Sequence, residues 1–163
     1  MSLRKSVHPG EHAAVDVKCQ AERSRNMAAV RSKGTKPEMT LRYALWRSGL
    51  RYFTSGGWFR LTGIRLPGSP DLILPSAHIA LFVDGCFWHG CPLHYHYPEQ
   101  NADFWRNKLI QNIQRDQRVN ERLSDLGWQV LRVWEHDLKG PGFPQVISAI
   151  VQRHRASQGR ITG

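Results

Sequence analysis

Cysteine and histidine side chains are concentrated in one short segment, residues 82–94, which reads FVDGCFWHGCPLH. Four residues separate Cys86 from Cys91, and two more separate Cys91 from His94. Thiolate and imidazole ligands at such short spacing are typical of a structural zinc site, which takes four ligands. The segment therefore predicts a bound Zn²⁺ and supplies three of its ligands.

Three histidines are candidates for the fourth zinc ligand. His89 and His96 lie in or beside the segment, whereas His136 follows a separate apolar run much later in the chain. A site that clamps a loop gains from one ligand that is distant in sequence, so His136 is the preferred candidate. His89 could equally act as a general acid or base, because an imidazole titrates close to neutral pH.

Two aspartates border short apolar runs that suit buried strands. Asp71 opens the run 71–74, and Asp84 directly follows the run 79–83. If the two strands are neighbours, both carboxylates can project at one end of the sheet, where such oxygen ligands suit Mg²⁺. Bound Mg²⁺ can polarise a phosphodiester and activate water. The alternative is that both aspartates only form turns, as Asp commonly does.

Large aromatic side chains stand beside these polar groups. Phe87 and Trp88 lie between the predicted zinc ligands, and Trp105 follows at the start of a helical pattern. They are either core residues or wedges that enter the stack of a kinked DNA duplex. Basic side chains that could follow phosphates, or simply form a solvated helix face, come next: Arg106, Lys108, Arg115 and Arg118.

The charge of the chain points to a polyanionic partner. Its 163 residues carry a formal net charge of +10, and the sequence pI is about 10.2. A basic domain of this kind most often meets nucleic acid, although ordinary surface charge is the simpler reading. Three cysteines are too few for a disulfide framework, which favours a reducing cytoplasm. The sequence has neither a membrane-spanning apolar run nor a signal peptide, so we expect no membrane association.

The pattern of elements predicts one compact α/β domain over residues 23–155. A flexible basic arm at 1–22 precedes it, and a short tail at 156–163 follows. Thr35, Pro37 and Glu38 have the spacing of a capped helix start, and Glu38 could serve only that cap. The helix, ending near Gly49, carries an apolar set at helical spacing: Met39, Tyr43, Trp46 and Leu50.

Further elements follow from periodicity. Residues 51–70 indicate a strand or hairpin with a turn, and 130–134 indicate another strand. Helices are predicted over 103–126 and 145–155. The first of these helices carries apolar residues near one face, namely Trp105, Leu109, Ile113, Leu123 and Leu126.

Taken together, these residues resemble the very-short-patch-repair (Vsr) DNA mismatch endonucleases. The resemblance runs from about Arg23 to Leu138 in five ordered blocks: RSRNMAAVRSKGTKPE, LPGSPDLIL, LFVDGCFWHGCPLH, FWRNKLIQNIQRD and LGWQVLRVWEHDL. It implies a restriction-endonuclease-like core, a mixed central sheet flanked by helices, with a structural zinc.

The family also implies an activity. It nicks double-stranded DNA 5′ of the T in T:G mismatches that arise by deamination of 5-methylcytosine, through Mg²⁺-dependent phosphodiester hydrolysis. We expect a monomer acting in the bacterial cytoplasm, with other mismatch-repair proteins as possible partners.

Site residues carry over from this resemblance position by position. Asp71 matches the Mg²⁺-binding aspartate, and Val83 matches a residue that ligates Mg²⁺ through its backbone carbonyl. His89 matches the catalytic histidine, and Glu38 a further active-site acid. Asp84 stands where some members carry histidine, so it is either a metal ligand or a proton carrier.

The resemblance also assigns DNA contacts and the last zinc ligand. His136 takes the position of a cysteine ligand in the family, so the site becomes Cys2His2. Phe87, Trp88 and Trp105 match the aromatics that intercalate beside the mismatch. Four polar or basic side chains complete the expected DNA contacts: Arg25, Asn26, Lys108 and Arg115.

Two other functions remain open on sequence alone. One is a restriction-type nuclease of the same fold, which would cut matched duplex at some sequence. The other is a zinc-stapled DNA-binding module without catalysis, in which Asp71 and His89 could be replaced without loss of function.

Overall fold

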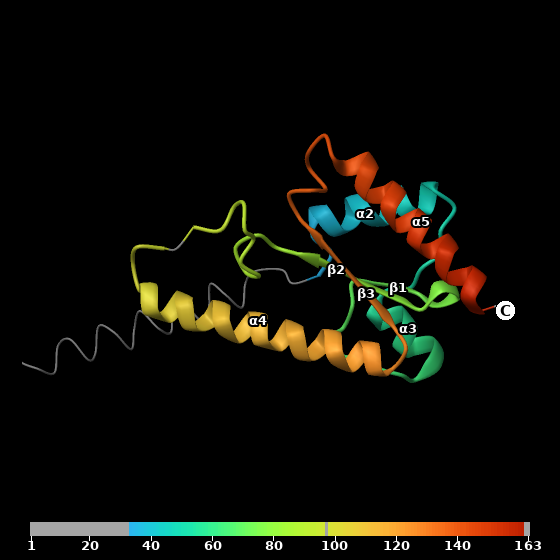
Figure 1. The fold of residues 1–163 in the computed structure, drawn as a ribbon, viewed down its shortest axis with the longest axis horizontal. Coiled ribbons are helices and arrows are strands. Elements are labelled where there is room, and N and C mark those ends of the chain that lie inside the picture. Colours follow the sequence, from blue (N-terminus) through green and yellow to red (C-terminus); the bar gives the residue numbers. More distant parts are fainter. Residues whose placement is uncertain (1–32, 97, 162–163) are drawn as a thin grey trace, which may run out of the picture. The chain divides into compact units, whose positions relative to one another are not determined.

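A computed structural model describes residues 33–96 and 98–161, and the elements below belong to the unit Lys36–Gly163 (Figure 1). The predicted basic arm at 1–22 lies outside the described residues, as do Arg25 and Asn26. None of the described helices is long and apolar enough to cross a membrane.

The centre of the unit is a mixed sheet of three strands in the order β1-β2-β3. These are β1 (Leu72–Leu74), β2 (Ile79–Asp84) and β3 (Gln129–Trp134). The first pair is antiparallel and the second is parallel. All three strands were expected from their apolar runs. The short 3-10 turn η1 (Pro75–Ala77) joins β1 to β2.

Helices cover both faces of this sheet, as an α/β architecture requires (Figure 1). On one side lie α2 (Lys36–Arg47) and α5 (Phe143–Ile161); on the other lie α3 (Ser55–Thr62) and α4 (Ala102–Asp125). Side chains alternate along a strand, so each strand feeds two cores. The first core contains Leu41, Leu45, Leu72, Leu74, Leu81 and Ile150, and the second contains Ile73, Ala80, Phe82 and Leu123.

The face that α2 buries differs from the predicted one. Met39, Tyr43 and Trp46 are about half exposed or more (50%, 64% and 54%). Leu41 and Leu45 are fully buried instead. Both sets have helical spacing, but the leucine stripe is the one that joins the core shared with α5. Leu50, just beyond the helix, is buried as expected.

The strand or hairpin predicted for residues 51–70 is wrong over most of that range. Residues Ser55–Thr62 form α3, because the Thr54 side chain accepts a hydrogen bond from the Gly57 N–H at 3.2 Å and caps the helix. Only Phe53 keeps strand character, in an isolated bridge to Ile73. The cap, together with the packing of Trp58 against the second core, offsets the low helix propensity of the two glycines in this stretch.

The long helix α4 agrees with the predicted range, but its buried face is only partly as expected. Leu123 is fully buried, whereas Ile113 and Leu126 are exposed and Asn112 is buried. The C-terminal half of α4 packs on the sheet and its N-terminal half runs beside the Cys/His loop (Figure 1), so the helix buries no single stripe along its length, and Leu126 lies just beyond its end. The last helix, α5, continues to Ile161 instead of ending at Arg155.

Candidate active site and metal centre

The two predicted aspartates lie at the same end of the β1–β2 pair. Leu72 pairs with Leu81 in antiparallel register, which brings Asp71 alongside the last residues of β2. The Asp71 carboxylate accepts a hydrogen bond from the Val83 N–H at 2.8 Å. Asp84 ends β2 and is buried. The sheet thus places two carboxylates where the sequence pattern predicted them.

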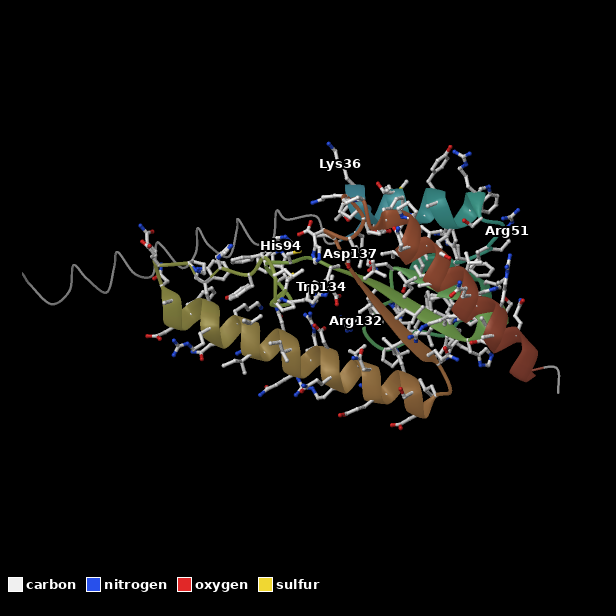
Figure 2. The ribbon with its side chains drawn as sticks, turned by 45° about the horizontal axis from the view of Figure 1, so that its top comes forward. Lys36, Arg51, His94, Arg132, Trp134 and Asp137 are labelled. Atoms are coloured by element: carbon white, nitrogen blue, oxygen red, sulfur yellow. The ribbon has the colours of Figure 1, made fainter. Side chains whose placement is uncertain are left out.

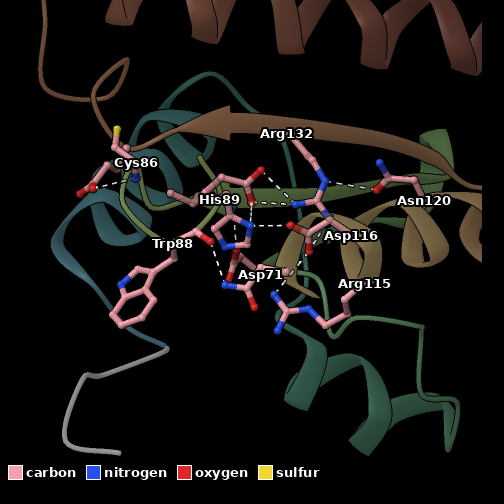
Figure 3. A network of polar contacts seen from close by, with 12 residues as sticks. Asp71, Cys86, Trp88, His89, Arg115, Asp116, Asn120 and Arg132 are labelled. Atoms are coloured by element: carbon pink, nitrogen blue, oxygen red, sulfur yellow. Dashed lines mark hydrogen bonds and ion pairs between the residues drawn. The ribbon is translucent and has the colours of Figure 1, made fainter. Parts of the chain in front are cut away.

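An arginine that the sequence analysis did not single out neutralises Asp84 (Figure 3). Nη1 of Arg132 donates to both oxygens of Asp84, at 2.8 and 2.9 Å. Arg132 lies on β3 directly opposite Phe82, and its guanidinium stands over that ring, 4.7 Å from the centroid. A charged side chain within an apolar strand such as VLRVW needs a partner, and this was the signal available in the sequence.

His89 is held by a carboxylate from α4. Its Nδ1 lies 2.6 Å from Oδ2 of Asp116 and 3.8 Å from the nearer oxygen of Asp84. A carboxylate only accepts hydrogen bonds, so this contact requires a proton on Nδ1, and in the neutral tautomer that carries it the Nε2 lone pair is available as a base. Sequence reasoning missed Asp116, although it belongs to the block FWRNKLIQNIQRD.

Asp116 is also the meeting point of two arginines. Nη2 of Arg132 and Nη2 of Arg115 each lie 3.4 Å from its Oδ1. The Nε of Arg132 donates in addition to the Asn120 side chain on α4, at 3.2 Å. One polar network therefore connects β2, β3, α4 and the loop that carries His89 (Figure 3).

The four cysteine and histidine ligands predicted for zinc come together. One ligand atom from each of Cys86, Cys91, His94 and His136 lies within 4.8 Å of all the others. Cys86 Sγ lies 3.2 Å from His136 Nδ1. Cys91 Sγ lies 3.6 Å from His94 Nδ1 and 3.6 Å from His136 Nδ1. Tetrahedral zinc with bonds of about 2.0–2.3 Å places its ligand atoms about 3.5 Å apart. The cluster is compatible with a metal site.

His136 enters this cluster from the chain that leaves β3, and its ring lies 4.4 Å from that of His94, centroid to centroid. Figure 2 shows Trp134 and Asp137, which flank His136 in sequence, in the same region as His94. His89, the competing candidate in the loop, turns to Asp116 instead. Within the described part of the chain, His96 does not belong to the cluster.

A carboxylate ties the metal loop to the end of β3. Glu135 accepts a hydrogen bond from the Cys86 N–H at 3.0 Å and pairs with Lys139 at 3.0 Å. Burial alone would raise the pKa of Glu135, but Lys139 and the Cys86 N–H lower it below its usual value. Burial raises the pKa of the Cys86 thiol, helped by Cys91. A bound metal cation would favour the thiolate form of Cys86, which is the form that ligates metal.

The three predicted wedge residues form one aromatic cluster. The Phe87 ring lies 5.1 Å from Trp88 and 5.2 Å from Trp105, centroid to centroid, and both contacts are edge-on. Asn112 of α4 donates to the Trp88 carbonyl at 2.8 Å and so fixes the loop on the helix. Lys108 lines the same small hollow as the three rings. The cluster therefore joins the Cys/His loop to the start of α4.

Two further predicted site residues lie on α2 and α4. Glu38 is buried on α2, where it pairs with Arg42 one turn later at 3.3 Å. Arg115 has a side chain that is 56% exposed and contacts Asp116, as described above.

Several known proteins are similar to this chain in sequence. The model of the DNA mismatch endonuclease Vsr family matches residues 15–94. The Type II nicking enzyme V.NaeI of Lentzea aerocolonigenes is 46% identical over 117 residues, 72% of this chain and 69% of that protein. The DNA mismatch endonuclease Vsr of Escherichia coli is 38% identical over 130 residues, 77% of this chain and 76% of that protein. The Type II nicking enzyme V.NmeDIP of Neisseria meningitidis is 40% identical over 119 residues.

Proposed function

This chain belongs to the Vsr family of DNA endonucleases, and we propose that it nicks double-stranded DNA 5′ of the T in T:G mismatches, by Mg²⁺-dependent hydrolysis. Family membership makes DNA the substrate class and favours an enzyme over a binding module without catalysis. The observation that carries the proposal is the position of the aromatic cluster. The loop that presents Phe87 and Trp88 also presents His89, fixed by Asp116.

His89 is suited to move a proton during hydrolysis. With its Nδ1 proton bound by Asp116, its Nε2 can accept a proton from the attacking water while the water oxygen bonds to phosphorus. The bond from phosphorus to the leaving sugar oxygen then breaks, that oxygen takes up a proton from solvent, and the His89 imidazolium returns its proton to solvent. The Asp116 carboxylate stabilises the imidazolium that forms in between.

The oxygen donors at the sheet end fit a magnesium ion. Asp71 offers a carboxylate that is already oriented by the Val83 N–H, and Val83 would add its backbone carbonyl. When bound there, Mg²⁺ would stabilise the negative charge that develops on the phosphoryl oxygens. Asp84 would act at this site through its ion pair with Arg132. Glu38 is assigned as a further active-site acid from its family position.

Zinc fits the other cluster because two thiols and two imidazoles provide the soft tetrahedral set it prefers. Held there, it would brace the loop between Cys86 and Cys91, which contains Phe87 and Trp88. These rings would then enter the base stack as a rigid wedge. A mispaired step costs less to unstack than a paired one, so the deformation itself selects the mismatch.

The test is nicking of one labelled duplex that carries T:G, T:A or C:G at the same position, in CT(A/T)GG-like and scrambled contexts. We expect Mg²⁺-dependent nicking of T:G alone, and its loss in Asp71→Ala with mismatch binding retained. Asp125→Ala, an exposed aspartate at the end of α4, is the matched control. Nicking of all three duplexes would favour a restriction-type enzyme. This alternative is specific because two of the relatives are named Type II nicking enzymes.

A further inference from the structure

We propose that Arg132 is a positioning residue of this active site. Its guanidinium forms an ion pair with Asp84 and a second one with Asp116. We infer that these contacts make His89 bond to Asp116 and not to Asp84. The inference deepens the proposed function and rests on it for the role of His89.

The contacts of Arg132 use its shape as well as its charge. Nη1 donates to Asp84, Nη2 lies 3.4 Å from Asp116 and Nε donates to Asn120. The N–H groups of a guanidinium point out in a planar fork, and the Arg132 Cζ lies 4.7 Å from the centroid of the Phe82 ring. A lysine ammonium at this position would keep the charge, but it could not reach the three acceptors with fixed geometry.

The two aspartates compete for the same histidine proton. Nδ1 of His89 is 2.6 Å from Asp116 and only 3.8 Å from Asp84, so a small rotation would change its partner. In this structure the charge of Asp84 is already paired with Arg132, which donates to both of its oxygens, and His89 bonds to Asp116. With Arg132 removed, Asp84 would be a buried carboxylate without its counter-ion. The nearest donor that could then bond to it is the Nδ1–H of His89, 3.8 Å away.

Such a shift would change the chemistry without removing any group that touches the substrate. The direction of the His89 Nε2 lone pair follows the partner of Nδ1, and proton transfer depends on that direction. Arg132 would therefore act on the rate of the chemical step more than on DNA binding. An arginine with a purely structural role would instead change folding, metal content and DNA affinity together.

The first test compares Arg132→Met, Arg132→Lys and the wild type in single-turnover nicking of the T:G duplex. The methionine keeps an apolar stem beside Phe82, and the lysine keeps the charge. We expect the nicking rate to fall about 10- to 100-fold in Arg132→Met, as for other groups that orient a catalytic side chain, and less in Arg132→Lys. Duplex affinity and metal content should stay within about twofold of the wild type. Arg153→Met, an exposed arginine on α5, is the control.

The second test reads the His89 imidazole directly. In protein with ¹⁵N-labelled histidine, two-dimensional spectra at one fixed pH report which ring nitrogen carries the proton and how uniform its environment is. We expect a single Nδ1-protonated state for His89 in the wild type, and a changed or averaged signal in Arg132→Met. If Arg132→Met does not fold, Arg132→Lys decides in both tests.

Two results would overturn the inference. One is a wild-type nicking rate and an unchanged His89 signal in both folded variants. The other is a rate loss that follows a loss of affinity, metal or folding to the same extent. If the wild type fails to nick T:G but its His89 signal still depends on Arg132, the positioning role stands and the proposed function fails.

Discussion

His89 stands between two carboxylates and bonds to one of them: its Nδ1 is 2.6 Å from Asp116 and 3.8 Å from Asp84. The two aspartates come from different elements, α4 and β2, and they meet at the loop that follows β2. With the proton on Nδ1, Nε2 of His89 is free to act as the base of the proposed reaction. Asp116 is then the group that orients this histidine.

Asp116→Asn tests that relationship. The amide is nearly the same size, but it can present an N–H to His89 and so favour the wrong tautomer. We expect the single-turnover nicking rate to fall by about 100-fold or more, since the comparable change in a Ser-His-Asp triad costs about 10⁴. Asp125→Asn serves as the control on the same helix. A nicking rate within about threefold of the wild type would exclude a role for the Asp116–His89 bond in catalysis.

The sequence predicted those parts of the site that depend on local spacing. Cys86, Cys91 and His94 lie within one short segment, so the chain needs no tertiary information to bring them together. His136 was preferred as the fourth ligand because a ligand distant in sequence clamps a loop. The parallel pairing of β2 with β3 brings His136 to the other three candidate ligands.

The polar network could not be predicted in the same way. Arg132, Asp116 and Asn120 each come from elements whose relative register is set only by tertiary packing. The same limit explains the face of α2, where two apolar stripes had equal spacing. Leu41 and Leu45 are buried in place of Tyr43 because they are the side chains that face α5 and the sheet.

Loss of one zinc ligand should destabilise the loop. We expect Cys91→Ser to lower the metal content from about one zinc per chain to well below that, because a structural site needs four ligands. Thermal unfolding should shift to a lower temperature, since metal binding contributes to folding. Mass spectrometry of the native protein and calorimetry give the two readings.

Cys19→Ser is the matched control for that experiment, because Cys19 stands far from the ligand segment in sequence. It should keep the metal content of the wild type. A zinc-free wild-type protein with unchanged nicking activity would contradict the metal assignment.

Stability should depend on pH through His154. Burial lowers the pKa of His154 below its usual value of 6.5, and its Nε2 lies 3.0 Å from the Ser76 hydroxyl. The unfolded chain therefore binds this proton first as pH falls. The folded state loses stability from about pH 6.5 downward, until the folded-state pKa is passed. Well above pH 6.5 the histidine is neutral in both states and contributes no slope.

We expect His154→Gln to remove this part of the pH dependence. The melting temperature of the wild type minus that of the variant should decrease as pH falls from about 7.5 to 5. Ser76→Ala, which removes the contact and keeps the histidine, should retain the wild-type slope. A pH-independent difference for His154→Gln would mean that burial does not perturb this group.

Mismatch preference should depend on the aromatic cluster. In the double variant Phe87→Ala plus Trp88→Ala, we expect the affinity for T:G duplex to approach that for T:A duplex. The selectivity should fall by about tenfold or more, because stacking of one aromatic on a base is worth about 1–3 kcal/mol. Competition binding with the two duplexes measures the ratio directly, without requiring cleavage.

Truncating these rings also removes contacts with Trp105, so the variant needs a control for general loss of packing. Phe59→Ala removes an exposed aromatic of α3 that lies outside the cluster, and it should leave the T:G to T:A ratio unchanged. A wild-type ratio in the double variant, with zinc still bound, would assign Phe87 and Trp88 to packing alone. Selectivity would then have to come from groups that contact the base edges or the backbone.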